Sequence, residues 1–522
     1  MNDSLAEGAP RRRRAGGRAA HARPSDPLAG QMPWQIPEVP DRPVEPLDEG
    51  GVLRIHGAAL RILSEIGIDF LNDEALELLR ASGGARIDGA RVRFEPAFVT
   101  EMVARAPGSF TITPRNPDRA IPVGGRHLLF MPVASPPNAW DLRQGKRSGD
   151  MAAFLDFTKL TQAFNCLHLI GGYPVEPVDL HPSIRHLDCL LAQLTLTDKV
   201  VHAYSLGTER VEDVMEMVRI AAGLSHAEFD AAPRMFTNIN SVSPLKHDWP
   251  MIDGALRMAR RGQPVVVTPF TLAGAMAPVT LAGAVAQSLA EALSAIALLQ
   301  YAAPGAPVAL GTFTSNVDMK SGAPAFGTPE YMRATQMTGQ MARFYGLPLR
   351  ASGVCTANAP DGQAMWETSN SLWAAVQSGT NMVYHAAGWL EGGLIASPEK
   401  LVMDCEILQM IQRYCAAELW ASDDAALAFD AVDEVGPGGH FFGCAHTQAR
   451  YATAFYSPIA SDWRNYEAWA AEGAIETPER AHRLARHVID AFEPPPLDEG
   501  LREELEAFVA RRKAEGGAPT DF

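Results

Sequence analysis

The segment 351–393 holds the densest collection of side chains that could carry out chemistry. It reads ASGVCTANAPDGQAMWETSNSLWAAVQSGTNMVYHAAGWLEGG, and two apolar, strand-like runs at 349–354 and 381–385 accompany its polar groups. The candidate catalytic residues in it are Asn358, Asp361, Glu367 and His385. Polar groups that follow parallel strands gather at one edge of a sheet, where active sites form. The segment therefore predicts a site at strand ends.

A second motif, HFFGCAH at 440–446, places two imidazoles and a thiol close together. His440, Cys444 and His446 could ligate zinc if a loop brought them together. A fourth ligand and a His-Glu-x-x-His helix are missing from the sequence. We therefore predict no metal bound directly by this chain, and capping of backbone groups remains the alternative role for these histidines.

The elements that must position these residues follow an alternating pattern. Short apolar runs rich in β-branched residues are separated by Ala- and Leu-rich helical segments, which is typical of parallel strands with crossover helices. The predicted strands are 166–171, 200–204, 235–239, 264–268, 307–312, 349–354 and 381–385. We predict an α/β fold, a (β/α)8 TIM barrel of which one strand stays unassigned. An open doubly wound sheet is the alternative, but its Gly-x-Gly-x-x-Gly turn is absent.

Four segments are expected along the chain. Residues 1–50 are rich in Pro, Gly and Arg and predict a flexible tail or an arm. Residues 51–149 predict an N-terminal helical and β cap, with strands at 110–113 and 127–133. The barrel should occupy 150–470, and 471–522 should form C-terminal helices.

Composition limits the partners and the compartment. The net charge is -16, which argues against nucleic acid and anionic membrane surfaces. The uncharged stretch 265–290 is broken by Gly and Pro, so we expect a buried strand, loop and helix instead of a membrane span. Six scattered cysteines fit a reducing cytoplasm. The large apolar content and the arm-like N-terminus favour a homo-oligomer.

Several motifs together resemble one family. They are PFTLAGA at 269–275, GTFTSNVDMKSGAPAFGTPE at 311–330, NAPDGQAMWE at 358–367, AGWLEGGLIASPEKLVMD at 387–404 and GHFFGCAHT at 439–447. In this order they resemble the trimethylamine methyltransferase family of corrinoid-dependent methyltransferases. The resemblance covers roughly residues 50 to 490 and leaves only the tails outside.

The resemblance implies a (β/α)8 barrel that passes a methyl group from a methylated amine to the Co(I) corrinoid of a small partner protein. Archaeal trimethylamine enzymes of this family carry pyrrolysine in the loop that here contains Asn358, and this chain has none. Members without pyrrolysine resemble demethylases of quaternary amines such as glycine betaine. The resemblance also places His440 and His446 toward the corrinoid.

The chemistry of a quaternary amine sets what the site should offer. The leaving group is already a neutral amine, so alignment and dry surroundings suffice without a general acid. Aromatic rings should hold the cation, with carboxylates as counter-charge and polar groups for a substrate carboxylate. The substrate-binding candidates are Asn240, Phe313, Gln363, Trp366, Tyr384, Trp389 and Glu391.

Three other functions stay open at this point. One is a methyltransferase of a tertiary amine such as trimethylamine, and another is a zinc-dependent enzyme on the same barrel. The third is a non-catalytic protein that binds betaine without turnover.

Overall fold

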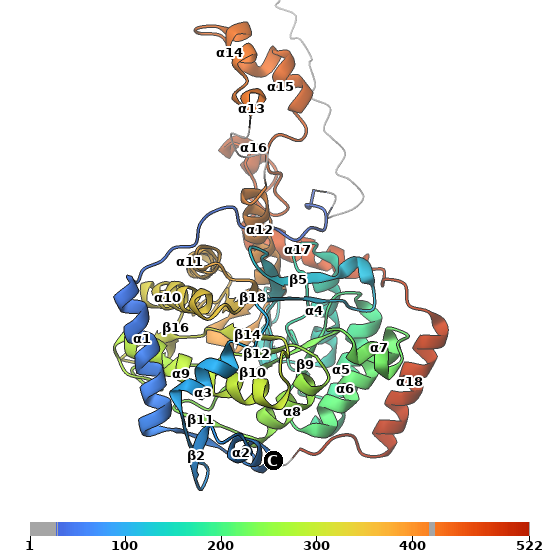
Figure 1. The fold of residues 1–522 in the computed structure, drawn as a ribbon. Coiled ribbons are helices and arrows are strands. Elements are labelled where there is room, and N and C mark those ends of the chain that lie inside the picture. The colour runs from blue at the N-terminus through green and yellow to red at the C-terminus, as the bar shows by residue number, and fades with distance from the viewer. Residues whose placement is uncertain (1–27, 29, 417–422, 521–522) are drawn as a thin grey trace, which may run out of the picture.

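The computed structural model describes residues 28, 30–416 and 423–520, and its centre is a ring of parallel strands enclosed by helices (Figure 1). Seven strands pair in the order β6-β18-β17-β14-β12-β10-β9, each parallel to its neighbours. Their bounds are β6 (Leu129–Pro132), β9 (His202–Tyr204), β10 (Phe236–Ile239), β12 (Val265–Val267), β14 (Val308–Gly311), β17 (Leu349–Ser352) and β18 (Met382–Ala387).

The segment 166–171 closes the ring between β6 and β9. The backbone N–H of His168 donates to the carbonyl of Phe130 at 2.8 Å, and that of Ile170 donates to Val200 at 2.9 Å. Leu169 also forms a parallel bridge with Val200. The predicted (β/α)8 barrel is therefore confirmed, and the segment 166–171 takes the place of the eighth strand in the ring.

Eight helices form the outer layer, one after each strand. They are α4 (Met151–Ala163), α5 (Pro182–Leu196), α6 (Thr208–Ala221), α8 (Trp249–Arg260), α9 (Leu281–Ala302), α10 (Pro329–Tyr345), α11 (Gly362–Ser378) and α12 (Pro398–Tyr414). Local sequence sets their ends: Thr328 and Ser397 cap helices that begin with proline, and Gly346 and Gly379 end α10 and α11 in the left-handed conformation.

One expected strand belongs elsewhere. The run 127–133 was expected in the cap, but β6 lies in the barrel wall beside β18. All four of its residues are buried, because the barrel interior covers one face and the helix layer covers the other. It is the strand that the sequence left unassigned.

The cap packs on the outside of the barrel and closes one end of it. Its helices and strands are α1 (Glu49–Arg61), β1 (Ile68–Phe70), α2 (Asp73–Ser82), β2 (Ala85–Asp88), β3 (Arg91–Phe94) and α3 (Pro96–Val103), and α1, α2 and α3 contact α9. The hairpin β4 (Ser109–Ile112) and β5 (Ile121–Gly124) inserts Ile112, Ile121 and Val123 into the barrel core beside Leu129 and Val266. The amino-terminal end of the barrel is thereby plugged.

Helix α9 is long and apolar enough to cross a membrane, the one such helix in the described ranges. Its most apolar window is 83% buried inside the fold. The stretch 265–290 thus forms strand β12, a loop and the start of a core helix, as the sequence predicts.

The chain leaves the barrel after α12 and forms a projecting arm, which we define as residues 423–472 (Figure 1). It contains the short helices α13 (Asp424–Leu427), α14 (Phe429–Val435), α15 (Ala445–Arg450) and α16 (Tyr466–Ala471). The chain then returns as α17 (Thr477–Asp490) against α12 and α4, and α18 (Glu499–Ala514) packs on α5 and α6.

Candidate active site at the barrel mouth

A cavity of 460 Å³ lies at the carboxyl ends of the barrel strands. Each side of it comes from a different βα unit, so the barrel positions side chains that are far apart in sequence. The residues that matter below are His202, Asn240, Phe313, Arg350, Tyr384, His385 and Trp389. Five of these, Asn240, Phe313, Tyr384, His385 and Trp389, are among the residues that the sequence predicted.

Aromatic rings form one wall of the cavity. Phe313 stacks on Phe326 with ring centroids 5.4 Å apart and lies 5.0 Å from Phe270. The ring of His385 lies 4.2 Å from that of Trp389, whose indole N–H donates to the carbonyl of Cys355 at 3.1 Å. The wall is therefore fixed by packing and by a hydrogen bond before any ligand arrives.

Arg350 supplies the charge of the cavity. Its side chain is buried at 3% exposure, and no carboxylate of the described chain lies within ion-pair distance of it. The guanidinium carbon lies 4.2 Å from the ring centroid of Tyr384 and 5.3 Å from that of Phe313. Burial lowers the pKa of Arg350 to about 10, so the group stays cationic at neutral pH. Such an uncompensated buried cation is costly unless a ligand pairs with it.

His385 adds a second unmatched donor beside this cation. Its Nδ1 accepts from the backbone N–H of Ala134 at 3.2 Å, so the neutral ring carries its proton on Nε2. Burial, followed by the charge of Arg350, lowers the pKa of His385 well below its usual range. Nε2 lies 3.4 Å from Nη2 of Arg350, also a donor. An anion between them would accept from both.

Backbone geometry explains why two consecutive residues of β18 reach the cavity. In a regular strand, Tyr384 and His385 would point to opposite faces. His385 has φ 53°, in the left-handed region, and the pairing of β18 with β6 shifts register between Val383 and Ala387. This irregularity turns both side chains toward the cavity.

Three further buried donors at this site have no partner among the described residues: Arg350 Nε, the Tyr384 hydroxyl and His202 Nδ1. The Nε2 of His202 accepts from the backbone of Asn238 at 3.0 Å, which places the ring proton on Nδ1. Burial lowers the pKa of His202 to about 3, so this ring is neutral. These three unmatched groups can all donate, which suits a carboxylate ligand.

The remaining predicted residues of the segment 351–393 lie outside the cavity, and three of them hold a loop or a helix end. The carboxylate of Glu367 accepts from the backbone of Thr356 at 2.7 Å and Ala357 at 3.0 Å, and Gln363 donates to it at 2.8 Å. Asp361 caps α11 through Ala364. These acids hold a loop and a helix end.

Three other predicted residues also lie apart from the cavity. Asn358 is exposed, and the indole of Trp366 is 60% exposed on α11. Glu391 pairs with Lys146 of the strand β8 (Gly145–Ser148). The expected acidic counter-charge is therefore absent from the described cavity lining, and the charge found there is cationic.

His440 and His446 lie on the projecting arm (Figure 1), and neither of them lines the cavity. The Sγ of Cys444 contacts the hydroxyl of Thr447 at 3.3 Å. In the part of the chain that the structure describes, no three His, Cys, Asp or Glu side chains are grouped so that they could hold a metal ion.

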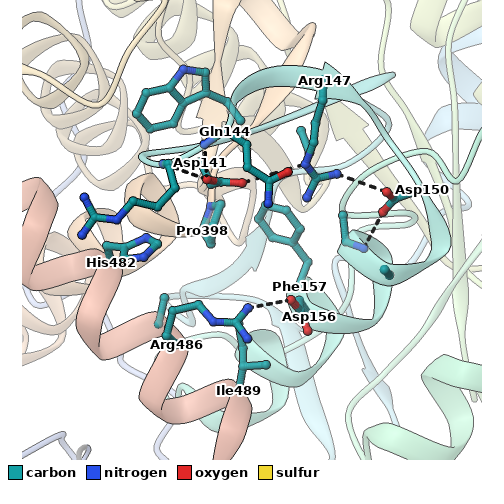
Figure 2. A pocket seen from close by; sticks show the side chains of 16 residues that line it. Asp141, Gln144, Arg147, Asp150, Asp156, Phe157, Pro398, His482, Arg486 and Ile489 are labelled. Atoms are coloured by element: carbon teal, nitrogen blue, oxygen red, sulfur yellow. Dashed lines mark hydrogen bonds and ion pairs between the residues drawn. The ribbon is translucent and has the colours of Figure 1, made fainter.

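A second cavity, of 590 Å³, lies between β8, α4 and α17 (Figure 2). Its charges are matched, with Arg486 3.1 Å from Asp156 and Arg147 3.3 Å from Asp150. None of the predicted site residues lines it. Its paired rim contrasts with the barrel mouth, where the cation is unpaired.

Arg350 and His202 line the cavity but are not among the residues that the sequence predicts. Arg350 lies inside the predicted strand 349–354, whereas the sequence predicts site residues at the ends of strands. A signal was present, because an arginine within an otherwise apolar, buried strand needs a partner.

Fold and site together define a (β/α)8 barrel with a cavity at the carboxyl ends of its strands. The family model described as Trimethylamine methyltransferase (MTTB) matches residues 13–517. The chain belongs to the trimethylamine methyltransferase family, and its activity is that of a methyltransferase.

Relatives of this chain carry three substrate names. It is 36% identical over 472 residues to the glycine betaine methyltransferase of Desulfitobacterium hafniense (strain Y51), covering 90% of this chain and 98% of that protein. It is 29% identical to the trimethylamine methyltransferase MttB of strain DSM 10664 / DCB-2, covering 89% and 93%. The proline betaine:corrinoid methyltransferase of Eubacterium limosum is 27% identical, covering 74% and 81%.

Proposed function

We propose that this protein moves a methyl group from a small quaternary amine bearing a carboxylate, such as glycine betaine, to the Co(I) corrinoid of a separate small protein. One observation carries the proposal: the buried, unpaired Arg350 among aromatic rings. Two relatives are named for betaines, and the name of one includes a corrinoid acceptor.

The two poles of a betaine fit two levels of the cavity. The carboxylate would take hydrogen bonds from Nε of Arg350 and the Tyr384 hydroxyl, which have no partner among the described residues, and from Nε2 of His385, which faces Nη2 of Arg350. The trimethylammonium group would then lie against the rings of Phe313 and Trp389, and each such contact contributes about 0.5 to 2 kcal/mol. Because Arg350 is the more deeply buried pole, the methyl groups face the opening of the barrel.

The lack of an acid in the cavity supports a quaternary substrate. None of the described lining residues is Asp or Glu. Breaking the carbon–nitrogen bond of a quaternary amine leaves the electron pair on nitrogen as a neutral amine, so no proton has to move. A tertiary amine leaves as a neutral amine only while its nitrogen keeps a proton. A site for it should therefore hold that N–H, for example with a carboxylate, which the described lining does not offer. The cation of Arg350 would also repel an ammonium ion that carries no carboxylate.

The corrinoid enters as the methyl acceptor, a reduced cobalt nucleophile presented by its carrier protein. This chain's own part is to hold the substrate by its carboxylate, to exclude water from the onium group and to aim one methyl outward. The residues of the cavity are sufficient for these tasks without a metal of their own.

We place the reaction in the cytoplasm. All six cysteines lie in the described ranges and are free thiols, and five of them are buried. Free thiols and a low-potential acceptor both fit a reducing compartment.

The test uses purified full-length chain, chemically reduced cobalamin and three donors: glycine betaine, choline and trimethylamine. We expect glycine betaine to convert the Co(I) spectrum to that of methyl-Co(III), because it alone carries both the quaternary nitrogen and the carboxylate. Choline keeps the quaternary nitrogen without the carboxylate and is the matched control. Equal turnover of choline would contradict the role of Arg350, and no conversion with any quaternary amine would contradict the function.

A calorimetric titration separates the non-catalytic alternative. If glycine betaine binds but never methylates cobalt, the chain is a binding protein. The isostere 3,3-dimethylbutyrate keeps the carboxylate and the shape but has a neutral carbon in place of the cationic nitrogen. We expect it to bind about 10-fold more weakly than betaine, because the cation–π contribution is lost.

A further inference from the structure

The arm is the part of the described chain with the least interior. Among residues 423–472, only the small side chains of Ala431, Cys444 and Ala460 are buried. Its helices have four to seven residues, a length at which an isolated helix is unstable in water. The arm therefore lacks a core of its own.

Large apolar side chains instead cover the outside of the arm, with exposed fractions from 45% to 87%. They are Leu427, Phe429, Val432, Phe441, Phe442, Tyr451, Phe455, Trp463 and Tyr466. Side chains of this kind bury about 150 to 250 Å² when fully covered, so these nine expose roughly 900 Å² of surface that a partner could cover. A stable interface needs about 800 Å² per partner.

An apolar groove lies at the root of the arm. It has a volume of 570 Å³ and lies between α11, α12 and the returning chain, with Met365, Met403, Ile407 and Met410 among its lining residues. Methionine side chains adapt to the shape of a partner, and Met410 is 37% exposed. The same chain thus has exposed apolar side chains on the arm and a largely apolar groove at its base.

We propose that the arm docks on a second copy of this chain, its tip in the groove between α11 and α12 of that copy. A two-fold axis across the arm brings each tip to the root of the other, so both contacts form at once. This arrangement is self-complementary and closed, which suits one chain bearing both surfaces. None of the described arm residues lines the cavity at the barrel mouth, so we assign the arm to assembly of the protein.

The first test measures the mass of the full-length protein at about 10 μM by light scattering. We expect an even-numbered oligomer for the wild type. The triple variant Phe429→Glu, Phe442→Glu, Phe455→Glu and the single variant Met410→Glu should each halve the mass, because both surfaces are needed. The matched control is Leu53→Glu, a similarly exposed apolar residue on α1, which should leave the mass unchanged. Circular dichroism verifies that each variant is folded.

A mixing experiment then tests the pairing of arm with groove. The triple arm variant keeps an intact groove, and Met410→Glu keeps an intact arm. An equimolar mixture should regain the wild-type mass because one arm–groove contact can form. A mixture that stays at the halved mass would overturn the arm-on-groove assignment. A monomeric wild type, or arm variants of wild-type mass, would overturn the docking proposal, including the case in which the arm captures the corrinoid protein instead.

Discussion

Arg350 and Lys400 are both buried cations in neighbouring βα units, yet only Lys400 has a carboxylate partner in the described chain. Lys400 forms an ion pair with Asp404 and donates to the hydroxyl of Thr368 at 2.8 Å. Asp404 also accepts from the backbone of Gly388 at 2.8 Å. Around Arg350, Nη1 donates to the hydroxyl of Ser352 at 2.8 Å and to the carbonyl of Thr312 at 3.4 Å, but these acceptors are uncharged, and the other neighbours are rings and His385.

The difference separates a structural charge from a functional one. The Lys400 pair is complete within the fold, so its neutralisation requires nothing from outside. Arg350 carries the desolvation penalty of burial without a counter-ion, and folding alone does not remove that penalty. A site retained in this state is prepared for an anionic ligand.

The largest effect is expected from Lys400→Met. Removing the lysine leaves Asp404 buried without its cation, which should lower the free energy of unfolding by about 3 to 5 kcal/mol. Urea denaturation measures this loss, and the double variant Lys400→Met, Asp404→Leu should recover most of it. A loss below about 1 kcal/mol would mean that the pair is not the buried structural unit described here.

Arg350→Met should have the opposite profile. We expect kcat/KM for glycine betaine to fall about 100-fold, near 3 kcal/mol, because a buried charge partner of the substrate is lost. The stability should be unchanged or higher, since an unpaired buried charge disappears. Methyl-Co(III) formation and urea denaturation measure the two quantities. Destabilisation as large as that of Lys400→Met would show that Arg350 is structural as well.

The protons around Arg350 extend the comparison to pH. The folded pKa of His202 is about 3, below its unfolded value of 6.5, so the unfolded state binds more protons between these limits. The stability contribution is therefore complete above pH 6.5 and is lost as the pH falls, by about 1.4 kcal/mol per pH unit. Other buried histidines with a lowered pKa, such as His168 and His247, add to the total slope. Urea denaturation at pH 5, 6 and 7 should therefore show a steeper total slope, and His202→Gln should reduce it by one proton. An unchanged slope in that variant would refute the assignment.

The smallest effect is expected from Tyr384→Phe, which removes a hydroxyl without a partner in the free protein. We expect KM for betaine to rise about 5-fold, because one hydrogen bond contributes about 1 kcal/mol. Stability should stay within about 0.5 kcal/mol, and choline kinetics should not change. If choline were affected equally, the hydroxyl would not be facing the carboxylate.

The barrel could be predicted from the sequence because its strands are buried on both faces and therefore consist of continuous apolar runs. The strand β6 was harder to place, since its four residues follow a cap hairpin and pair with β18 from the far end of the barrel. Sequence order assigned it to its neighbours, whereas its register and burial assign it to the ring.

The site was predictable in part. Phe313 and Trp389 follow the ends of β14 and β18, and strand ends meet at the cavity. Tyr384 and His385 lie within β18, and both reach the cavity only because this strand is irregular. Glu367 and Asp361 also follow a strand, but their carboxylates turn back to bind backbone N–H groups. Sequence spacing does not show whether an acid faces a ligand or caps a loop. Arg350 was missed because it lies within a strand, where a charge looks like an interruption of the apolar pattern.

The pairing of β6 with β18 has a consequence for synthesis of the chain. Leu129 aligns with Met382, so the first strand of the barrel pairs with a strand that is synthesised about 250 residues later. During translation, a nascent chain that lacks β18 presents an unpaired strand edge, and such edges invite association with other chains. Chains truncated before residue 382 should aggregate, whereas in the full-length protein β18 pairs with this edge of β6.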